Sequence, residues 1–381
     1  MMRVEIKSLT ALRGIAALMV VIYHLEHPFY PVSHAIHSYT SLFTSGYLWV
    51  DFFFVLSGFV MTYVYGEAFK NAPNWSTYVD FIKKRLVRIY PVHIFMLFVF
   101  LAMRFVFSQL EAGSYPLFND IDNPYTFVLN IFLIQSWKTA PYLSWNGPSW
   151  SISVEWAAYL LFPIGLWILA TWRWSLALLA LLAGFGLLVA LNVWRGTLDI
   201  HWDYGVLRAL PSFGAGILIA RLRDVWVADH GPGFLGSNAV ALSAFALLLV
   251  SLHLGMPDVV SVAAATFVVG AFAFNESARG GNTVARWLSV GPLYYLGLIS
   301  YSLYMIHWFW ITLGKFVLSY YVTIEGTVGE RLLIQACLLA ATLASAPLLY
   351  HFIERPARNV LRRRLGTKPT PIRVASASSA T

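Results

Sequence analysis

Long apolar stretches separated by short polar ones run through almost the whole chain. Stretches this long with so few charges are typical of helices that cross a lipid bilayer. The pattern predicts ten such helices, over residues 9–27, 46–65, 89–108, 149–171, 175–194, 206–220, 235–254, 259–274, 292–320 and 331–352. We therefore expect an all-α polytopic membrane protein.

A further apolar segment, residues 124–137, is too short for an ordinary crossing. Lys and Arg gather on the cytoplasmic side of membrane proteins, and Arg3 and Lys7 put the amino terminus on that side. A full crossing by this segment would turn every later basic cluster outward. We therefore predict that residues 124–148 form a re-entrant or half-crossing segment whose backbone lines a cavity. Both termini are then cytoplasmic.

Composition supports the membrane interpretation, since 59% of residues are hydrophobic and only 12% are charged. Soluble domains carry about 25% charged residues. The net charge of +8 lies in short clusters between apolar runs, which is the positive-inside pattern and not a nucleic-acid surface. Cys337 lies in an apolar run, and no zinc, phosphate-loop or dinucleotide motif occurs, so we expect no metal and no tightly bound cofactor.

The chain divides into a membrane domain, residues 1–357, and a basic cytoplasmic tail, residues 358–381, whose end is rich in Ser, Thr, Ala and Pro and is expected to be disordered.

Two ionisable residues lie in the first predicted helix. Arg13 enters its apolar run and His24 leaves it, with ten residues between them. On an α-helix this separation is about 16 Å, or half a bilayer. Charged groups inside a membrane are costly and mark functional sites by default.

Counting depth along the helices places His24 in the outer third of the membrane. Asp51 and Glu155 have similar depths, so the three side chains are expected to share an outward cavity. A carboxylate beside a histidine fixes its tautomer and raises its basicity, as general-base catalysis requires. The alternatives are a histidine that reaches for water and a buried ion pair that holds the bundle together.

A second set faces the cytoplasm. Arg85 and Arg88 are three residues apart and share one helix face, at a depth comparable with Arg13. Three guanidinium groups around one pocket would bind phosphates well. The alternative is ordinary positive-inside anchoring, which explains Lys83 and Lys84.

Three further places carry candidate residues. Tyr304 and His307 share a helix face, and His307 is interpreted either as a satisfied interior histidine or as a cavity-lining one. Glu354 is expected to pair with a basic neighbour, and Pro356 to end the last helix. The tryptophans near the re-entrant segment belong to an interface belt or stack on sugars: Trp137, Trp145, Trp150 and Trp156.

Six stretches taken together, in this order, resemble the membrane acyltransferase-3 family, and they span nearly the whole chain. They are residues 12–17 with His24, residues 50–58, residues 85–91, residues 150–156, residues 299–304 with His307, and residues 353–356. The family's arginine–histidine signature falls on Arg13 and His24, and its paired-arginine motif falls on Arg85 and Arg88.

The resemblance implies a multi-pass enzyme of the bacterial inner membrane. Such an enzyme moves an acyl group, usually acetyl, from cytoplasmic acyl-CoA to a hydroxyl of an extracytoplasmic or lipid-linked glycan. Some members carry an SGNH hydrolase-like domain, for which this chain is expected to be too short. The acceptor is expected to contact four residues of the matching motifs: Trp150, Ser153, Tyr304 and His307.

We hypothesise that His24 is the general base or a transient acyl acceptor, oriented by Asp51 or Glu155. Arg13, Arg85 and Arg88 would hold the phosphates of CoA. Two other functions compete. A transporter or flippase for a lipid-linked glycan would suit the broken segment and the intramembrane charges, although no internal repeat supports it. A receptor or scaffold would use the same charges only to hold helices together.

Overall fold

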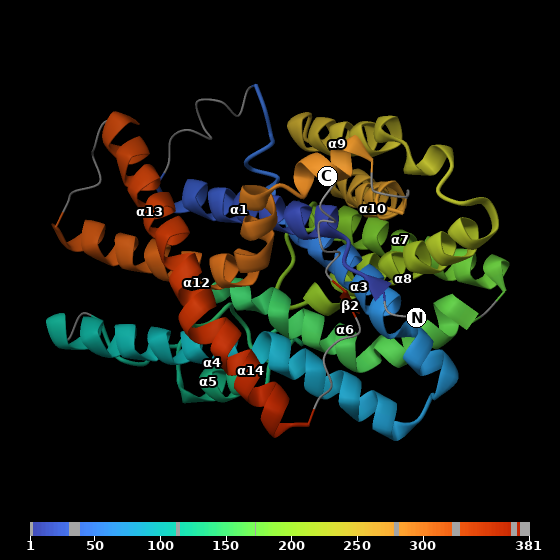
Figure 1. Cartoon of the computed structure of the whole chain (residues 1–381). Helices are drawn as coiled ribbons and strands as arrows, with labels where there is room; N and C mark the ends of the chain where they lie inside the picture. Colours follow the sequence, from blue (N-terminus) through green and yellow to red (C-terminus); the bar gives the residue numbers. More distant parts are fainter. Residues whose placement is uncertain are drawn as a thin grey trace, which may run out of the picture.

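The computed structural model describes residues 3–29, 39–111, 115–171, 173–277, 282–321, 328–366 and 372–373. They form a bundle of helices packed side by side (Figure 1). Its main helices are α1 (Lys7–Phe29), α3 (Trp49–Asn71), α4 (Trp75–Leu110), α6 (Trp150–Leu166), α7 (Trp174–Arg195), α8 (Gly205–His230), α9 (Asn238–His253), α10 (Asp258–Asn275), α12 (Gly291–Tyr321) and α13 (Val328–Leu349).

Short elements connect these helices. They are α5 (Pro124–Ile131), α11 (Thr283–Leu288), α14 (Arg355–Arg364), the 3₁₀ turns η1 (Gly46–Leu48), η2 (Gly147–Ser149) and η4 (Phe234–Gly236), and the π-helical turns η3 (Trp167–Thr171) and η5 (Tyr350–Glu354). A two-residue parallel pairing joins β1 (Arg3–Val4) to β2 (Ile372–Arg373).

The predicted fold class is confirmed: the protein is an all-α, multi-pass membrane protein. Each of the ten predicted ranges overlaps a helix. Within the described ranges, nine helical spans are long and apolar enough to cross a membrane, whereas α9 has only 16 residues. Large apolar side chains on the outside of the bundle, such as Leu179 on α7 and Leu333 on α13, are exposed because lipid surrounds them.

Glycine allows two pairs of helices to approach closely. A Cβ atom at Gly14 of α1 would lie 2.6 Å from the backbone nitrogen of Gly297 on α12. Likewise, Gly58 of α3 lies against the carbonyl group of Phe213 on α8. Small residues permit such contacts between membrane helices. These two contacts set the positions of α1 and α3, which carry Arg13 and Asp51.

The second and third predicted helices are joined differently from the expectation. The third helix was predicted to begin at residue 89, but α4 already begins at Trp75, where the side chain of Asn74 accepts a hydrogen bond from Thr77 N. The basic cluster of residues 83–88 therefore lies on a helix. Its side chains have fixed directions, which a loop would not give them.

The segment of residues 124–148 forms a half-length helix, α5, followed by irregular chain, so no full crossing occurs there. Its three non-glycine residues with positive φ, Leu133, Lys138 and Trp145, are the only ones among the described residues. Hydrogen bonds hold two of these residues in place, because Trp145 N donates to Asp122 Oδ1 at 2.6 Å and Lys138 N donates to the Trp202 carbonyl oxygen at 3.0 Å. None of residues 124–148 lines the two cavities described below, so the cavity-lining role of this segment stays a prediction.

The carboxyl-terminal part also differs from the expectation. Pro356 does not end the last helix, because it occupies the first turn of α14, where a proline needs no hydrogen-bond donor. The turn η5 lies just before it, and Glu354 at its end has no exposed surface. The first residues of the predicted tail are thus helical as far as Arg364, and most of the remainder lies outside the described residues.

Candidate functional site

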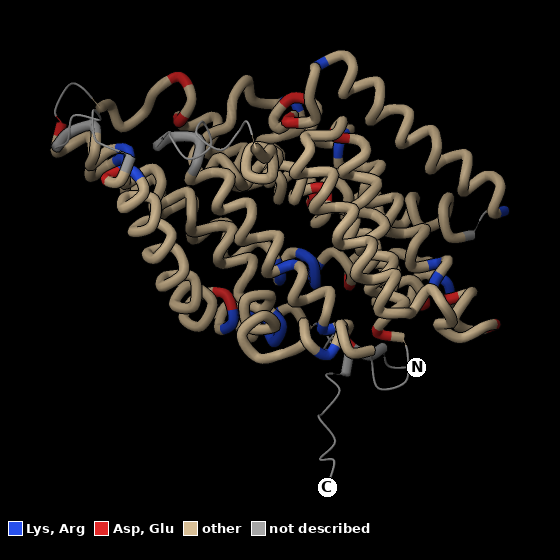
Figure 2. Tube along the Cα trace, turned by 90° about the horizontal axis from the view of Figure 1, so that it is seen from above, with Lys and Arg blue, Asp and Glu red and all other residues tan. Residues whose placement is uncertain are grey.

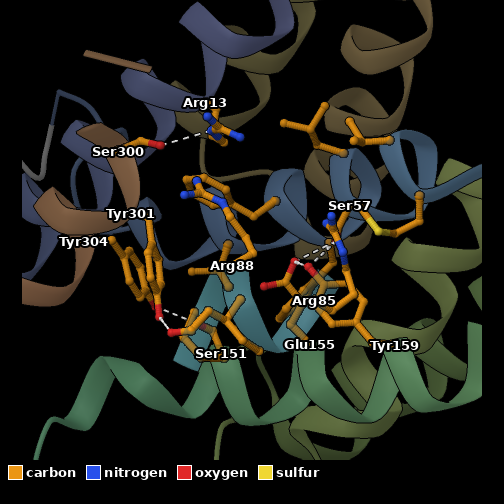
Figure 3. A pocket seen from close by; sticks show the side chains of 18 residues that line it. Arg13, Ser57, Arg85, Arg88, Ser151, Glu155, Tyr159, Ser300, Tyr301 and Tyr304 are labelled. Carbon is orange, nitrogen blue, oxygen red and sulfur yellow. Dashed lines mark hydrogen bonds between the residues drawn. The ribbon is translucent and has the colours of Figure 1, made fainter. Parts of the chain in front are cut away.

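The predicted arginines meet around one cavity inside the bundle (Figure 3). Arg13 comes from α1, Arg85 and Arg88 from α4, Glu155 from α6 and Tyr304 from α12. The cavity has a volume of about 150 Å³, and most of its remaining lining is apolar. Three helices therefore bring three cations and one carboxylate to a single space within the membrane region, and α12 adds Tyr304.

Arg13 is held by α12. Its Nε donates to Ser300 Oγ at 3.0 Å and one Nη donates to the carbonyl oxygen of Gly297 at 2.8 Å. The close approach at Gly14 makes this reach possible, since bulkier residues would separate the two helices. These bonds use two of the five guanidinium donors, and the group still lines the cavity.

Arg85 and Arg88 are held by different partners. Arg85 donates to Tyr65 OH at 2.7 Å, and its guanidinium lies 5.0 Å from the centre of that ring. Its Nε is buried without a hydrogen-bond partner. Arg88 forms an ion pair with Glu354, which also accepts from Ser302 Oγ at 2.7 Å. The expected pairing of Glu354 with a basic neighbour is thereby confirmed.

A wider space of about 440 Å³ adjoins the cavity, since Arg13, Arg85 and Arg88 line both. Lys84, Arg358 and Arg362 line it as well, against a single acidic residue, Glu5. Figure 2 shows Lys and Arg clustered towards the side of the molecule on which the amino-terminal end lies. The wider space is therefore a strongly basic vestibule, which would attract an anion.

Glu155 belongs to this cavity and not to the surroundings of His24. Its Oε1 accepts hydrogen bonds from Ser57 Oγ and Tyr159 OH, both at 2.6 Å. Figure 3 shows Glu155 beside Arg85. The expected outward cavity shared by His24, Asp51 and Glu155 is therefore wrong for Glu155. Counting residues along a helix could not predict its neighbours, which the arrangement of α6 against α4 decided.

Asp51 is likewise not beside His24. It pairs with Arg208 of α8, with 2.6 Å between Oδ2 and Nη2, and neither side chain has any exposed surface. Arg208 also donates to the carbonyl oxygens of Tyr47 and Ile200. This pair matches the alternative considered from the sequence, a buried ion pair between helices, and the orienting role expected for Asp51 is corrected accordingly.

His24 instead contacts a second histidine. His307 Nε2 lies 3.3 Å from His24 Nδ1, and the two ring centres are 5.0 Å apart. Tyr23 and Trp308 pack edge-on against the His24 ring. His307 is fully buried and joins this cluster to the cavity, because its neighbour Tyr304 lines the cavity wall, with 5.6 Å between the two ring centres.

The expected acceptor-contact residues separate into two groups. Tyr304 lines the cavity, and its hydroxyl bonds to Ser151 Oγ at 2.8 Å and to the Pro148 carbonyl. Trp150 and Ser153 face away from it. Trp150 is 3% exposed and covers Arg208, and Ser153 donates to the Leu133 carbonyl and holds the segment of residues 124–148. Their contacts are those of packing residues, and Trp145 is likewise buried and does not form a belt.

A polar cluster lies beyond Tyr23, in the loop between α7 and α8. Tyr23 OH donates to Asp199 Oδ2 at 3.1 Å, and His201 Nε2 lies 2.8 Å from the other carboxylate oxygen. Burial alone would raise the pKa of Asp199, but the hydrogen bond and charge of His201, with the charge of Arg208, hold that pKa below its ordinary value. Asp199 therefore stays ionised at neutral pH.

Several residues of these sites were missed by the sequence reasoning. Arg208 interrupts the apolar run of α8 as Arg13 interrupts that of α1, so the same cost argument would have found it. Arg358 and Arg362 were assigned to a tail, and only the helix α14 brings them to the vestibule. Asp199 lies in a short polar loop and carried no signal in the sequence.

Comparisons with known proteins agree with the resemblance in the sequence. The chain is 26% identical to acyltransferase MdmB of Streptomyces mycarofaciens, over 97% of this chain and 96% of that protein. It is 24% identical to O-acetyltransferase OatA of Staphylococcus aureus (strain NCTC 8325 / PS 47), over 92% of this chain. It is also 24% identical to the putative peptidoglycan O-acetyltransferase YrhL of Bacillus subtilis (strain 168), over 93% of this chain.

The chain spans 57% of the length of OatA and 55% of the length of YrhL. No solved structure matches it. The model of the acyltransferase-3 family, described as an acyltransferase domain, matches residues 6–351, which is most of the chain. The protein therefore belongs to the acyltransferase-3 family of membrane proteins.

Proposed function

We propose that this protein transfers an acyl group, most readily acetyl, from acyl-CoA to a hydroxyl group of a glycan. The glycan is extracytoplasmic or linked to a membrane lipid. The protein acts in the bacterial inner membrane, with both termini and the basic vestibule on the cytoplasmic side. The names of OatA and YrhL, O-acetyltransferases, support the reaction class, and the excess of Lys and Arg around the vestibule supports its orientation.

The observation that carries the proposal is the convergence of Arg13, Arg85 and Arg88 on one cavity that adjoins the basic vestibule. Guanidinium groups suit the paired phosphates of CoA, because each offers several donors in a planar fork. Arg85 has a buried Nε without a partner, which a phosphate oxygen would satisfy. Lys84, Arg358 and Arg362 add charge at the opening, where the nucleotide end of CoA would lie.

His24 is the proposed base. Tyr304 lines the cavity and contacts His307, and His307 contacts His24, so the thioester approaches His24 past the Tyr304 side chain. The acceptor oxygen attacks the thioester carbonyl carbon while His24 takes the hydroxyl proton. The C–O bond forms, the C–S bond breaks, and the proton passes to the departing sulfur, which leaves as the CoA thiol.

The test uses purified full-length protein in lipid vesicles, labelled acetyl-CoA and a panel of glycan acceptors. His24→Ala should lower transfer by at least about 100-fold, because a general base contributes about that much or more. The matched control is His230→Ala, since His230 is exposed at the end of α8 and should leave transfer unchanged. Full transfer by His24→Ala would overturn the assignment of the base.

The same assay separates catalysis from transport of a lipid-linked glycan. An acyltransferase consumes the thioester and releases the CoA thiol in proportion to acylated glycan. A flippase would move glycan across the vesicle membrane without consuming acetyl-CoA. Wild-type protein that translocates glycan but releases no CoA thiol would overturn the proposed function.

A further inference from the structure

His307 is a buried titratable residue in contact with the proposed base. It lies on α12 with no exposed surface, and its ring is inclined by 37° to that of His24. The carboxylates that the sequence suggested for orienting His24 are engaged elsewhere, Asp51 with Arg208 and Glu155 with Ser57 and Tyr159. The neighbour that α12 brings to His24 is thus an imidazole.

Backbone contacts determine where the ring protons sit. His307 Nδ1 lies 2.5 Å from the carbonyl oxygen of Tyr304, and His24 Nδ1 lies 2.9 Å from that of Val20. A carbonyl oxygen can only accept, so Nδ1 carries the hydrogen in both rings. In the neutral rings, Nε2 is then the basic nitrogen. The Nδ1 proton of His24 is directed both to Val20 O and to the lone pair of His307 Nε2, 3.3 Å away.

We propose that His307 is a positioning residue that holds His24 as the Nδ1–H tautomer, so that His24 Nε2 takes the proton of the acceptor hydroxyl. This inference rests on the proposed function, in which His24 is the base. Histidines in enzymes and metal sites are commonly oriented through the ring nitrogen that does not react. In this protein the partner of that nitrogen is a second imidazole, His307, whose own orientation is fixed by the Tyr304 carbonyl oxygen.

The contact also favours the charged state of His24 during transfer. When Nε2 takes the hydroxyl proton, His24 becomes an imidazolium and Nδ1–H becomes a stronger donor. The neutral His307 Nε2 accepts this bond, and no second proton is transferred. The proton on Nε2 then passes to the sulfur of CoA, and both rings return to their starting tautomers. His307 thus contributes in the transition state more than in the resting state.

Two substitutions at His307 test this. His307→Gln can keep an acceptor oxygen at the place of Nε2, whereas His307→Phe keeps the ring shape and removes it. His307→Phe should lower kcat for acetyl transfer by about 100-fold and leave KM for acetyl-CoA within about threefold. His307→Gln should retain most of the wild-type kcat. Equal losses in both variants, or no loss in His307→Phe, would overturn the proposal.

A control on the same helix accounts for general disturbance of α12. Trp310→Phe removes the indole donor to Ser345 on α13, at 2.8 Å, and should leave kcat unchanged. A second measurement does not depend on activity. ¹⁵N NMR of the histidine rings in the wild-type protein should report Nδ1–H for both His24 and His307, and an Nε2–H tautomer at His24 would overturn the proposal.

The outcomes for the two proposals are distinguishable. If wild-type protein releases no CoA thiol with any glycan, the proposed function fails. If His24→Ala retains transfer, His24 is not the base. If His24→Ala is inactive while His307→Phe has wild-type kcat, only the role of His307 is refuted.

Discussion

Arg85 and Arg208 are both arginines on membrane helices, but the surroundings of the two side chains are opposite in kind. Arg208 is sealed between Asp51 and the carbonyl oxygens of Tyr47 and Ile200, with no exposed surface. Arg85 lines a cavity, contacts Tyr65, and keeps a buried Nε without a partner. An arginine whose hydrogen bonds are satisfied inside the protein holds helices together, whereas one left incompletely satisfied beside a cavity is suited to a ligand.

The two arginines differ because the neighbouring helices place different residues beside them. Asp51 lies in the first turn of α3, and the close contact at Gly58 places α8 against it, so the ion pair closes without open space. Arg85 and Arg88 of α4 line the cavity with residues of α1, α6 and α12, and of these two only Arg88 meets a carboxylate within ion-pair distance among the described residues. In the sequence Arg208 is a single charge in an apolar stretch and Arg85 belongs to a basic cluster, and only their surroundings in the structure separate a structural role from a binding role.

Breaking the sealed pair should have the largest effect. Arg208→Met leaves the Asp51 carboxylate unpaired in the membrane region and should lower stability by about 3–5 kcal/mol. The double variant Asp51→Leu with Arg208→Met removes both charges and should recover most of this loss. Thermal unfolding in detergent measures all three proteins. A double variant as unstable as the single one would show that Arg208 acts through contacts other than Asp51.

Changing the cavity arginine should affect binding more than folding. Arg85→Gln removes a charge proposed to contact phosphate and should weaken acetyl-CoA binding about tenfold, or about 1.4 kcal/mol. Its melting temperature should stay close to that of the wild type, because Arg85 forms no close ion pair among the described residues and the neighbouring Glu155 keeps its hydrogen bonds from Ser57 and Tyr159. Calorimetric titration with CoA measures the affinity.

The control for Arg85 is Arg286→Gln on α11, an exposed arginine away from the cavity. This variant should bind CoA with unchanged affinity. If Arg85→Gln also binds CoA normally, the cavity is not the phosphate site. Arg85 then does not differ from Arg208 by binding a ligand.

The smallest effect is expected at a half-exposed pair. Asp199 beside His201 has a folded-state pKa below 3.8, so its ionised form stabilises the fold above about pH 4, and this contribution is lost as the pH falls through that pKa. Asp199→Asn should therefore be less stable than the wild type at pH 7, by less than about 1 kcal/mol. The difference in melting temperature should shrink as the pH falls below 3.8, the ordinary pKa of an Asp carboxyl group. A difference independent of pH would indicate lost packing instead of lost charge.

The sequence by itself determined the ten apolar helices and the residues worth testing. A membrane-spanning helix satisfies its own backbone and is surrounded by lipid, so its apolar composition is a local signal that needs no partner. Arg13 and His24 were likewise recognisable locally, because an ionisable group in an apolar run is costly wherever it lies. Helix ends in polar stretches carried weaker signals: α4 begins at Trp75 instead of Ile89, and α14 continues to Arg364.

Only the tertiary structure decided which of these residues meet. Depth in the membrane could be counted along each helix, but rotation about the helix axis and the choice of neighbour could not, because packing contacts such as that of Gly14 with Gly297 set them. For this reason Asp51 met Arg208, Glu155 joined the arginines, and His24 met His307. The residues of the candidate site could be chosen from their cost in lipid, whereas their partners depended on contacts between distant parts of the chain.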